Sequence, residues 1–489
     1  MEGVTELSSD EEILVRHLYA RLQRLRSVHE QLDAYYSGNQ HNQTIGLAVP
    51  PELRMFEFPL NWPRVTVDTV VQRQHVRSFS LPDDPDSNDY LSEIWEANNM
   101  ESQSVLNHLE ARIQGHGFVT VSTNDDDRGH PLINVESARS MIAQIDPRTR
   151  NITAALRVYY DPLEKAAPTE ATLYLPNSTI YLERVKGWQW AISDRDDHGL
   201  GKVPVVQFLN RPRVGNFTGE SEMRDVLRPT DMAARALMDL QVAMETHSVP
   251  AKWAAGMNKD DFIDATTGEI ANSWKPYFTA FTVTGNKDAK FGQFTASDLS
   301  NFKTVIDMLA EQVSAVTGLP MRYFGQNSAN PASEGAIRAD EVRLVRNVEL
   351  KNSTDGDGWA DVMALAYRFG KGEWLDGNRI RTDWDDTNTP TLSQKADAIQ
   401  KLVASGILSR EGAWDELGWS QARKDLERQR FNELEQAQWN DLLKPEGQSA
   451  DNGGAATAQN SGTAGQISAP SEQQDGSANA PHLASQRAG

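Results

Sequence analysis

The stretch from 297 to 369 constrains the fold more than any other, because its residue pattern predicts two helices joined by a short turn. Gly318 and Pro320 mark the end of the first helix. Six apolar residues before them recur at intervals of three and four, which places them on one helical face. They are Leu299, Phe302, Ile306, Leu309, Val313 and Val316.

A second, longer helix follows a polar loop. Asn330 offers an N-cap, and Pro331 suits the first helical position. The sequence then stays compatible with a helix from 332 to 369, a length of roughly 55 Å if the helix is continuous. Gly356 and Gly358 are expected to kink or interrupt it. Because its apolar stripe is thin, we expect this helix to lie against neighbouring subunits or to span a large assembly. The surface beside the stripe is charged, with Arg338, Asp340, Arg343, Arg346, Glu349 and Lys351.

The charge and the cysteine count exclude several classes of protein. The formal net charge is −21 over 489 residues, whereas a protein that grips nucleic acid through its phosphates needs clustered Lys and Arg. An acidic surface is compatible with nucleic acid moving past it, because the two repel each other. The chain has no cysteine, which excludes disulfides and thiolate metal sites. No apolar run is long enough for a bilayer and the start has no signal-peptide pattern, so we expect a soluble protein of the cytoplasm with no membrane partner.

In the first 210 residues, predicted helices are followed by predicted strands. Apolar spacing predicts helices at 10–36, at 64–79 and at about 89–116. From 118 to 209, short alternating segments are broken by Asp, Asn, Gly and Pro, which predicts one antiparallel sheet domain. Four tryptophans in this part are expected to pack in cores or interfaces rather than to stack on bases. They are Trp62, Trp95, Trp188 and Trp190.

The second half begins with a helix predicted at 220–247, with Pro229 near its start. This helix and the one that follows Ser297 flank a small, aromatic-rich module at 248–296. After residue 369 the sequence predicts a strand at 379–384 and helices at 391–405, 409–417 and 420–443. From Pro445 onward the residues are almost all small or polar, which predicts a disordered tail.

Patterns typical of catalytic and metal sites are weak. The Gly-Leu-Gly-Lys run at 199–202 resembles the end of a phosphate loop, but Asp196 and Val203 stand where that loop needs Gly and Ser or Thr, so a turn is preferred. The acidic run at 124–129 lacks the spacing of a calcium loop and favours a hairpin turn. Turn and cap roles are preferred for Asp383, Asp385 and Asp386, with a metal cluster as the less favoured alternative. The enzyme hypothesis has no positive support.

A series of short motifs runs in order along the chain, although none is diagnostic alone. They are Tyr35-Tyr36-x-Gly38, Asn61-Trp62-Pro63-Arg64, Ile94-Trp95-x-x-Asn98-x-Met100, Gly115-His116-Gly117-Phe118, Gly219-Glu220-Ser221-Glu222, Thr317-Gly318-Leu319-Pro320, Asn330-Pro331-Ala332-Ser333, Trp384-x-Asp386 and Ser409-Arg410-Glu411. In this order and spacing, the chain from about 10 to 443 resembles the portal proteins of long-tailed double-stranded DNA bacteriophages, especially those that infect actinobacteria. Pro229 departs from the family, whose first stem helix is usually uninterrupted.

The resemblance implies an α+β portal fold and a ring of about twelve subunits, a dodecamer, at one capsid vertex. Its regions would be a wing at 1–210, a first stem helix at 211–247, a clip at 248–296 and a second stem helix at 297–318. A tunnel loop at 319–333, a long wing helix with its return strand at 334–388, a helical crown at 389–443 and the disordered tail at 444–489 would follow.

The resemblance also implies where DNA and partner proteins would meet the ring. The tunnel loop facing DNA would present small neutral residues, namely Gln326, Asn327, Ser328, Asn330 and Ser333. The clip would meet the terminase and later the head-completion adaptor through Trp253, Trp274, Tyr277, Phe281, Lys287 and Lys290. Scaffolding and major capsid proteins would be further partners. No catalytic residue, cofactor or metal is expected.

The function expected from this resemblance is a non-enzymatic channel for DNA packaging and ejection. The portal would also nucleate procapsid assembly in the host cytoplasm before it becomes part of the virion. DNA would pass without sequence specificity. One alternative is a structural capsid or tail protein with no DNA-conducting role. A nuclease or ATPase of the packaging machine is a third, which the lack of a phosphate loop disfavours.

Overall fold

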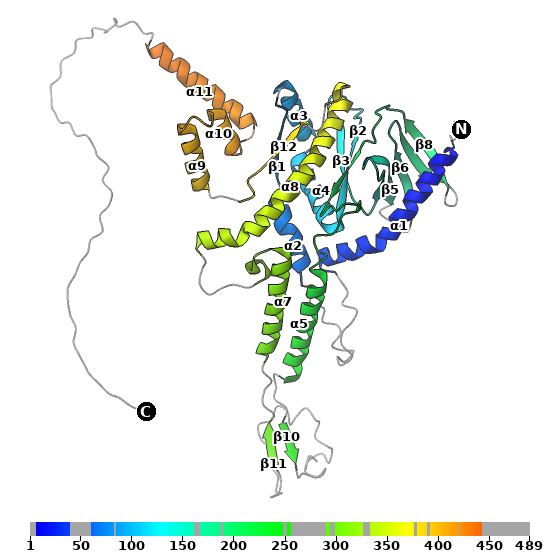
Figure 1. Ribbon diagram of the computed structural model, residues 1–489, viewed down its shortest axis with the longest axis vertical. Helices are drawn as coiled ribbons and strands as arrows, with labels where there is room; N and C mark the ends of the chain where they lie inside the picture. The colour runs from blue at the N-terminus through cyan, green and yellow to red at the C-terminus, as the bar shows by residue number, and fades with distance from the viewer. Residues whose placement is uncertain are drawn as a thin grey trace, which may run out of the picture. The chain divides into compact units, whose positions relative to one another are not determined.

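The computed structural model describes residues 6–39, 60–82, 85–160, 167–185, 189–247, 252–255, 290–293, 299–325, 333–375, 379–388, 392–419 and 421–442. The chain divides into two compact units, Met1–Ala404 and Ser405–Gly489 (Figure 1). The predicted tail at 444–489 lies outside the described residues, so its disorder stays a prediction.

The N-terminal helices are shorter and more numerous than predicted. Helix α1 (Ser9–Ser37) matches its prediction and begins with a capping box between Ser8 and Glu11. The helix predicted at 64–79 is wrong in its second half, because α2 (Trp62–Val71) ends at Val71. Strand β1 (Val76–Ser80) follows and pairs antiparallel with β12 (Arg381–Trp384). The single helix predicted at 89–116 is two, α3 (Pro85–Ala97) and α4 (Met100–Gln114), because Asn99 between them adopts a left-handed backbone conformation with φ of 51°.

The strands form two antiparallel sheets rather than the one that was predicted. A three-stranded sheet has the order β3 (Leu132–Glu136), β2 (His116–Ser122), β9 (Val205–Leu209). A five-stranded sheet runs in chain order through β4 (Met141–Ile145), β5 (Ile152–Tyr160), β6 (Pro168–Tyr174), β7 (Thr179–Arg184) and β8 (Trp190–Asp196). Leu18 and Leu22 of α1 share a core with Leu156, Leu173 and Ile180 of this sheet. Each sheet is covered by a different helix. Helix α1 packs on the five-stranded sheet, and the long helix at 334–371, described below, packs on β2 and β9 of the three-stranded sheet.

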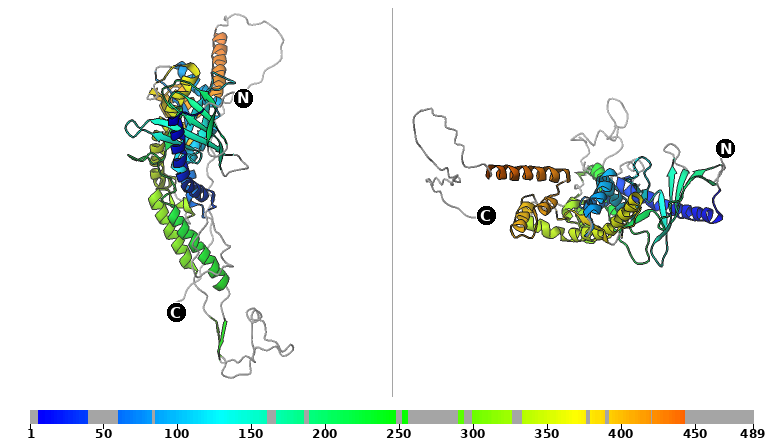
Figure 2. Two further views of the ribbon diagram at one scale, coloured as in Figure 1. Left: turned by 90° about the vertical axis from the view of Figure 1, so that its right-hand side faces the viewer. Right: turned by 90° about the horizontal axis from the view of Figure 1, so that it is seen from above.

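Helices α5 (Leu227–His247) and α7 (Ser300–Thr317) lie side by side and run in opposite directions (Figures 1 and 2). We call this pair the stem. Helix α5 begins at Leu227 and not at 220 as predicted, which puts Pro229 in the first turn, where its missing N–H leaves no helical bond unmade. Beyond the stem, β10 (Lys252–Ala255) pairs antiparallel with β11 (Lys290–Gln293).

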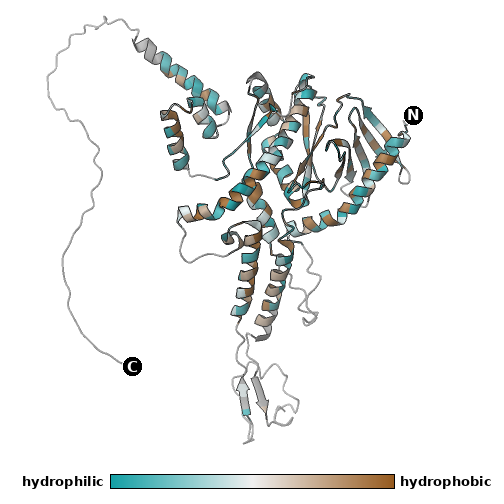
Figure 3. Ribbon diagram, in the orientation of Figure 1, coloured by the Kyte–Doolittle hydropathy of each residue, from teal (hydrophilic) through white to brown (hydrophobic). Residues whose placement is uncertain are grey.

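The C-terminal helices match their predictions. They are α9 (Leu392–Ala404) in the first unit, and α10 (Arg410–Glu416) and α11 (Gln421–Leu442) in the second. Within the second unit, Trp414 stacks on both Trp419 and Phe431. Figure 3 shows α11 largely in the colours of hydrophilic residues. Among the described helices, none combines the length and the apolar character that a membrane span requires.

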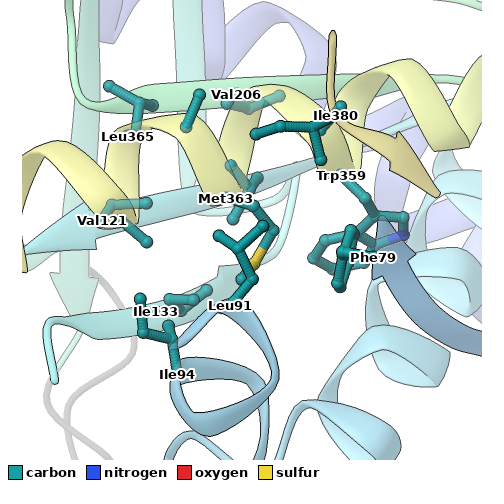
Figure 4. Packing of buried hydrophobic residues seen from close by; sticks show 14 of the residues in the cluster. Phe79, Leu91, Ile94, Val121, Ile133, Val206, Trp359, Met363, Leu365 and Ile380 are labelled. Atoms are coloured by element: carbon teal, nitrogen blue, oxygen red, sulfur yellow. The ribbon is translucent and has the colours of Figure 1, made fainter. Parts of the chain in front are cut away.

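The long helix α8 (Glu334–Lys371) runs unbroken for 38 residues, so the interruption predicted at Gly356 and Gly358 is wrong. These glycines serve packing instead: a Cβ on Gly358 would lie 2.8 Å from the ring of Phe208 in β9. The C-terminal half of α8 lies at the centre of the largest core, so residues of the same subunit bury it. The prediction that this helix lies against neighbouring subunits is therefore wrong for its C-terminal half. Figure 4 shows Trp359 and Met363 from this half among side chains of α3, β1, β2 and β9. The predicted cap is also corrected, because Ser333 and not Asn330 is the N-cap.

Candidate functional site

Few of the predicted contact residues fall in the described part of the chain. Gln326, Asn327, Ser328 and Asn330 lie outside it, as do Trp274, Tyr277, Phe281 and Lys287. Ser333 is described, and its Oγ accepts a hydrogen bond of 3.3 Å from the backbone N–H of Ala336. Trp253 in β10 lies opposite Gly292, and the exposed Lys290 lies opposite Ala255. The grouping of the predicted tunnel-loop and clip residues therefore stays a prediction.

The residues whose sequence patterns suggested a phosphate loop or a metal site make structural contacts instead. The backbone N–H groups of Gly199 and Gly201 donate to the backbone and side-chain oxygens of Asn177, at 2.9 and 3.0 Å. Asp383 accepts from Ser80, and Asp385 pairs with Arg77 at 2.9 Å. Within the described ranges, no group of three His, Asp or Glu side chains is placed to hold a metal ion. The segment at 199–202 is an irregular connection that leads into β9, which begins at Val205 and not at the predicted Val203.

The two ends of the predicted tunnel loop are tied together by one glutamate. The short 3-10 helix η3 (Met321–Phe324) lies near the start of the predicted loop at 319–333, and α8 follows the end of this loop. The Oη of Tyr323 donates to Glu341 of α8 at 3.0 Å, Arg73 of the α2–β1 turn donates at 3.1 Å, and Arg322 also pairs with Glu341. Burial alone would raise the pKa of Glu341, but the hydrogen bonds and positive charges of these neighbours lower it. The ionised carboxylate thus closes the base of the loop with charge-assisted bonds.

An apolar core lies next to these contacts of Glu341 and includes residues of both stem helices, α5 and α7. The ring of Phe324 meets Trp62 edge-to-face at 6.0 Å between centroids. Leu309 and Val313 of α7 and Leu344 of α8 belong to the same buried cluster. The stem, η3, α2 and the first half of α8 are therefore packed into one body at the root of the predicted loop.

A second buried contact, next to the segment that leads into α5, is a polar network, here called the junction network. It consists of Gln74, Arg112, Asn210, Glu222, Lys351 and Asp355, from the α2–β1 turn, α4, the end of β9, the segment before α5, and α8. Lys351 had been placed on the charged surface of the long helix by its sequence. It is buried, with 7% of its side chain exposed, so that prediction is wrong.

Two ion pairs connect the members of the junction network. The Nζ of Lys351 lies 2.7 Å from the Oε2 of Glu222 and donates to the Oδ1 of Asn210 at 2.7 Å. Arg112 pairs with Asp355 and donates to the same Asn210 oxygen at 3.1 Å. Asn210 returns a hydrogen bond to Glu222 at 3.0 Å. One amide thus connects both ion pairs.

Gln74 completes the network from the other side. Its Oε1 accepts two hydrogen bonds from Arg112, and its Nε2 donates to Asp355 at 3.0 Å. Burial lowers the pKa of Lys351 to about 8 despite the attraction of Glu222. Burial would raise the pKa of Glu222, but Lys351 and Arg211 lower it to about 2, so both partners are charged at neutral pH.

The backbone around the network is packed so closely that glycine is required. Gly219 has φ of 64°, and a Cβ there would lie 2.1 Å from the carbonyl oxygen of Gly115. The backbone N–H of Glu220 donates to Asn210 at 3.0 Å, and that of Asn210 donates to Gly115 at 2.8 Å. Three chain segments therefore cross without side chains between them, and this crossing fixes the position of the segment that leads into α5.

Comparison with known proteins assigns this arrangement to a family. Residues 15–440, which are more than half of the chain, match the family described as phage portal protein, SPP1 Gp6-like. The portal proteins of Mycobacterium phages D29 and L5 are each 37% identical over 422 residues, covering 84% of this chain and 86% of the relative.

Similar chains also occur in solved structures. A chain in a native gene transfer agent virion has a TM-score of 0.43 at 14% identity, over 74% of this chain and 91% of that one. A chain from the neck of an empty gene transfer agent particle has a TM-score of 0.42 at 12% identity, over the same shares of the two chains. From the family match and the mycobacteriophage relatives, the chain belongs to the phage portal proteins, the head–tail connectors of bacteriophages, and is a structural and not an enzymatic protein.

Proposed function

We propose that this chain forms a closed ring of about twelve subunits at one vertex of the capsid, through which double-stranded DNA is packaged and later ejected. The observation that carries the proposal is the family match over residues 15–440, together with two relatives that bear the name portal protein. The match includes the stem, the junction network and the loop between η3 and α8, which are the parts that the function requires.

The regions take the roles that the resemblance implied. The wing at 1–210 and the long helix with its return strand at 334–388 form the outer body, and the stem helices at 211–247 and 297–318 extend from it. The clip at 248–296 docks the terminase during packaging and the head-completion adaptor afterwards. The crown at 389–443 belongs to the inner side of the capsid, and the ring nucleates procapsid assembly with scaffolding and major capsid proteins in the host cytoplasm.

The charge of the chain supports passage of DNA without capture. Each subunit carries a net charge of −21, which a ring repeats around its axis, and DNA is repelled by a surface of its own sign. Clustered basic side chains would bind the phosphates and release counterions, which favours binding instead of sliding. The loop at 319–333 adds small neutral side chains at the position nearest to the DNA in this proposal.

Electron microscopy of the purified protein with analysis of rotational symmetry tests the proposal. The expected particle is a ring with a hole on its axis and with wings wider than the stem. A particle without an axial opening would contradict it and would favour a capsid or tail protein that never touches DNA. The purified protein is expected to hydrolyse no ATP, and hydrolysis by the chain alone would point to a motor subunit.

A further inference from the structure

One side of α7 carries an exposed stripe without charge. Its members are spaced by four, three, four and four residues, so they share a helical face. Met308 and Val316 in this stripe are 47% and 56% exposed, although Val316 was predicted to share a helical face with Val313, which is buried. The complete stripe is Asn301, Val305, Met308, Gln312 and Val316. Single exposed apolar residues are normal on a protein surface, whereas three of them on one uncharged helical face are what a contact with another subunit would bury.

Helix α5 carries a second exposed face, about 100° around the helix from a residue that is buried with α7. Ala233 is buried in the core that α5 shares with α7, whereas Met232, one residue earlier, is 57% exposed. Arg228 and Asp239 lie on the same outer face as Met232 and are also exposed. Figure 3 shows hydrophilic and hydrophobic colours in alternation along both stem helices, as expected for helices with one buried and one exposed side. The stem therefore presents two different faces on two different sides.

We infer that, in the ring, the outer face of α5 centred on Met232 packs against the α7 stripe centred on Met308 of the adjacent subunit. The partner is thus a second copy of this chain. This inference rests on the proposed ring, because a head-to-tail ring needs two unlike, complementary faces on each subunit. Burial of the two methionines and of Val305 and Val316 supplies the apolar centre of the contact.

The charges at the edge of the two faces complement each other. Arg228 lies in the first turn of α5, where the helix dipole favours an acid and disfavours a cation. Glu311 lies on the border of the α7 stripe. Because α5 and α7 are antiparallel, the start of α5 and the end of α7 lie at the same end of the stem. Within the described part of the chain, neither side chain has a recorded ion pair, so contact between copies would supply the acid that Arg228 lacks.

Disulfide trapping tests the contact, and the absence of native cysteine makes the test clean. The doubly substituted chain Met232→Cys with Met308→Cys is oxidised as assembled rings and run on a non-reducing gel. We expect a ladder of covalent oligomers up to the whole ring, because each subunit joins the next. A disulfide within one subunit would need the two Cα atoms about 4.4–6.8 Å apart. Such a bond would leave the chain monomeric on the gel, so it cannot be mistaken for the ladder.

Matched controls separate this contact from its alternatives. Met232→Cys with Lys303→Cys, whose second site lies about 140° around α7 from Met308 at roughly 100° per residue, is expected to give no ladder. Arg228→Glu and Glu311→Arg are each expected to lower the yield of rings several-fold, and the double swap is expected to restore it. This swap keeps the inference testable if the cysteine pair prevents assembly.

The outcomes distinguish the contact from the proposed function. Rings that form normally but give no ladder with Met232→Cys and Met308→Cys would overturn the contact and leave the proposed ring unaffected. This result is expected if the α7 stripe faces the channel. Dimers from Met308→Cys alone would overturn it too, because the stripe would then face itself. Absence of rings from the unsubstituted protein would overturn the proposed function along with the contact.

Discussion

Removal of the Asp355 carboxylate from the junction network is predicted to lower the free energy of unfolding by about 3 kcal/mol. Asp355 and Arg112 each have about 1% of the side chain exposed. Taking away one partner of a buried ion pair leaves a buried charge and typically costs about 3–5 kcal/mol. The lower end applies to Asp355→Ala, because Arg112 keeps two hydrogen bonds to Gln74 and one to Asn210.

Urea denaturation at fixed protein concentration measures this loss, since assembly also shifts the midpoint. The matched control is Asp357→Ala, which removes an exposed aspartate from the same helix and should change stability by at most about 0.5 kcal/mol. Replacing both partners, as in Arg112→Met with Asp355→Leu, should cost less than Asp355→Ala alone, because no buried charge loses its ion-pair partner. A loss below about 1 kcal/mol, or one equal to that of the control, would refute the argument that a buried charge pair holds the junction.

Three further results are expected. Gly358→Ala should cost about 1–3 kcal/mol because its Cβ would meet the Phe208 ring at 2.8 Å, whereas Gly335→Ala on the open start of α8 should not destabilise; equal melting curves would contradict this. Deletion of 326–330 should leave rings intact but reduce DNA packaging or retention, and normal genome filling would remove the loop's assigned role. As the pH is lowered through about 5.5, the free energy of unfolding should fall by about 2 kcal/mol per pH unit. Burial lowers the pKa of three histidines to about 4, so the unfolded chain binds more protons than the folded one in this range. Glu136 partly offsets this effect, because burial raises its pKa to about 7. The histidines are His29, His108 and His116, and urea midpoints that rise with acidity between pH 6.5 and 5 would contradict this sign.

The elements with strong local signals could be predicted from the sequence. Apolar spacing and a capping box define α1, and a serine N-cap defines the start of α10. The stem helix α7 ends at Gly318, which takes the left-handed conformation expected of a C-cap glycine. These features depend on residues within one turn of each other.

The features that depended on distant partners were missed. The strand β1 was predicted as helix because its partner β12 lies some 300 residues later, and pairing decides the structure of so short a segment. A glycine in a helix locally favours a break, but Gly358 stands where the ring of Phe208 from β9 packs against α8 and leaves no room for a Cβ. Nothing in the neighbourhood of Lys351 shows that Glu222 and Asn210 will surround it. Its only signal is a place in the helix beside buried positions, where a lysine is unusual.

The candidate site divides in the same way. The motifs around Gly115 and Gly219 were visible as short matches, and the structure explains them, because the two backbones cross where no side chain fits. The junction network that surrounds this crossing could not be assembled from sequence, since its six residues come from five separate segments. Buried polar groups gain their partners only through the tertiary fold.

A cryo-electron microscopy map of the capsid vertex in the intact virion tests the central claim most directly. The account predicts a ring of this chain around an open axis at that vertex, with α5 and α7 extending from the wing and Lys351 in contact with Glu222 in every subunit. A vertex without this polypeptide, or a ring of it whose axis is closed by the folded body, would contradict the account.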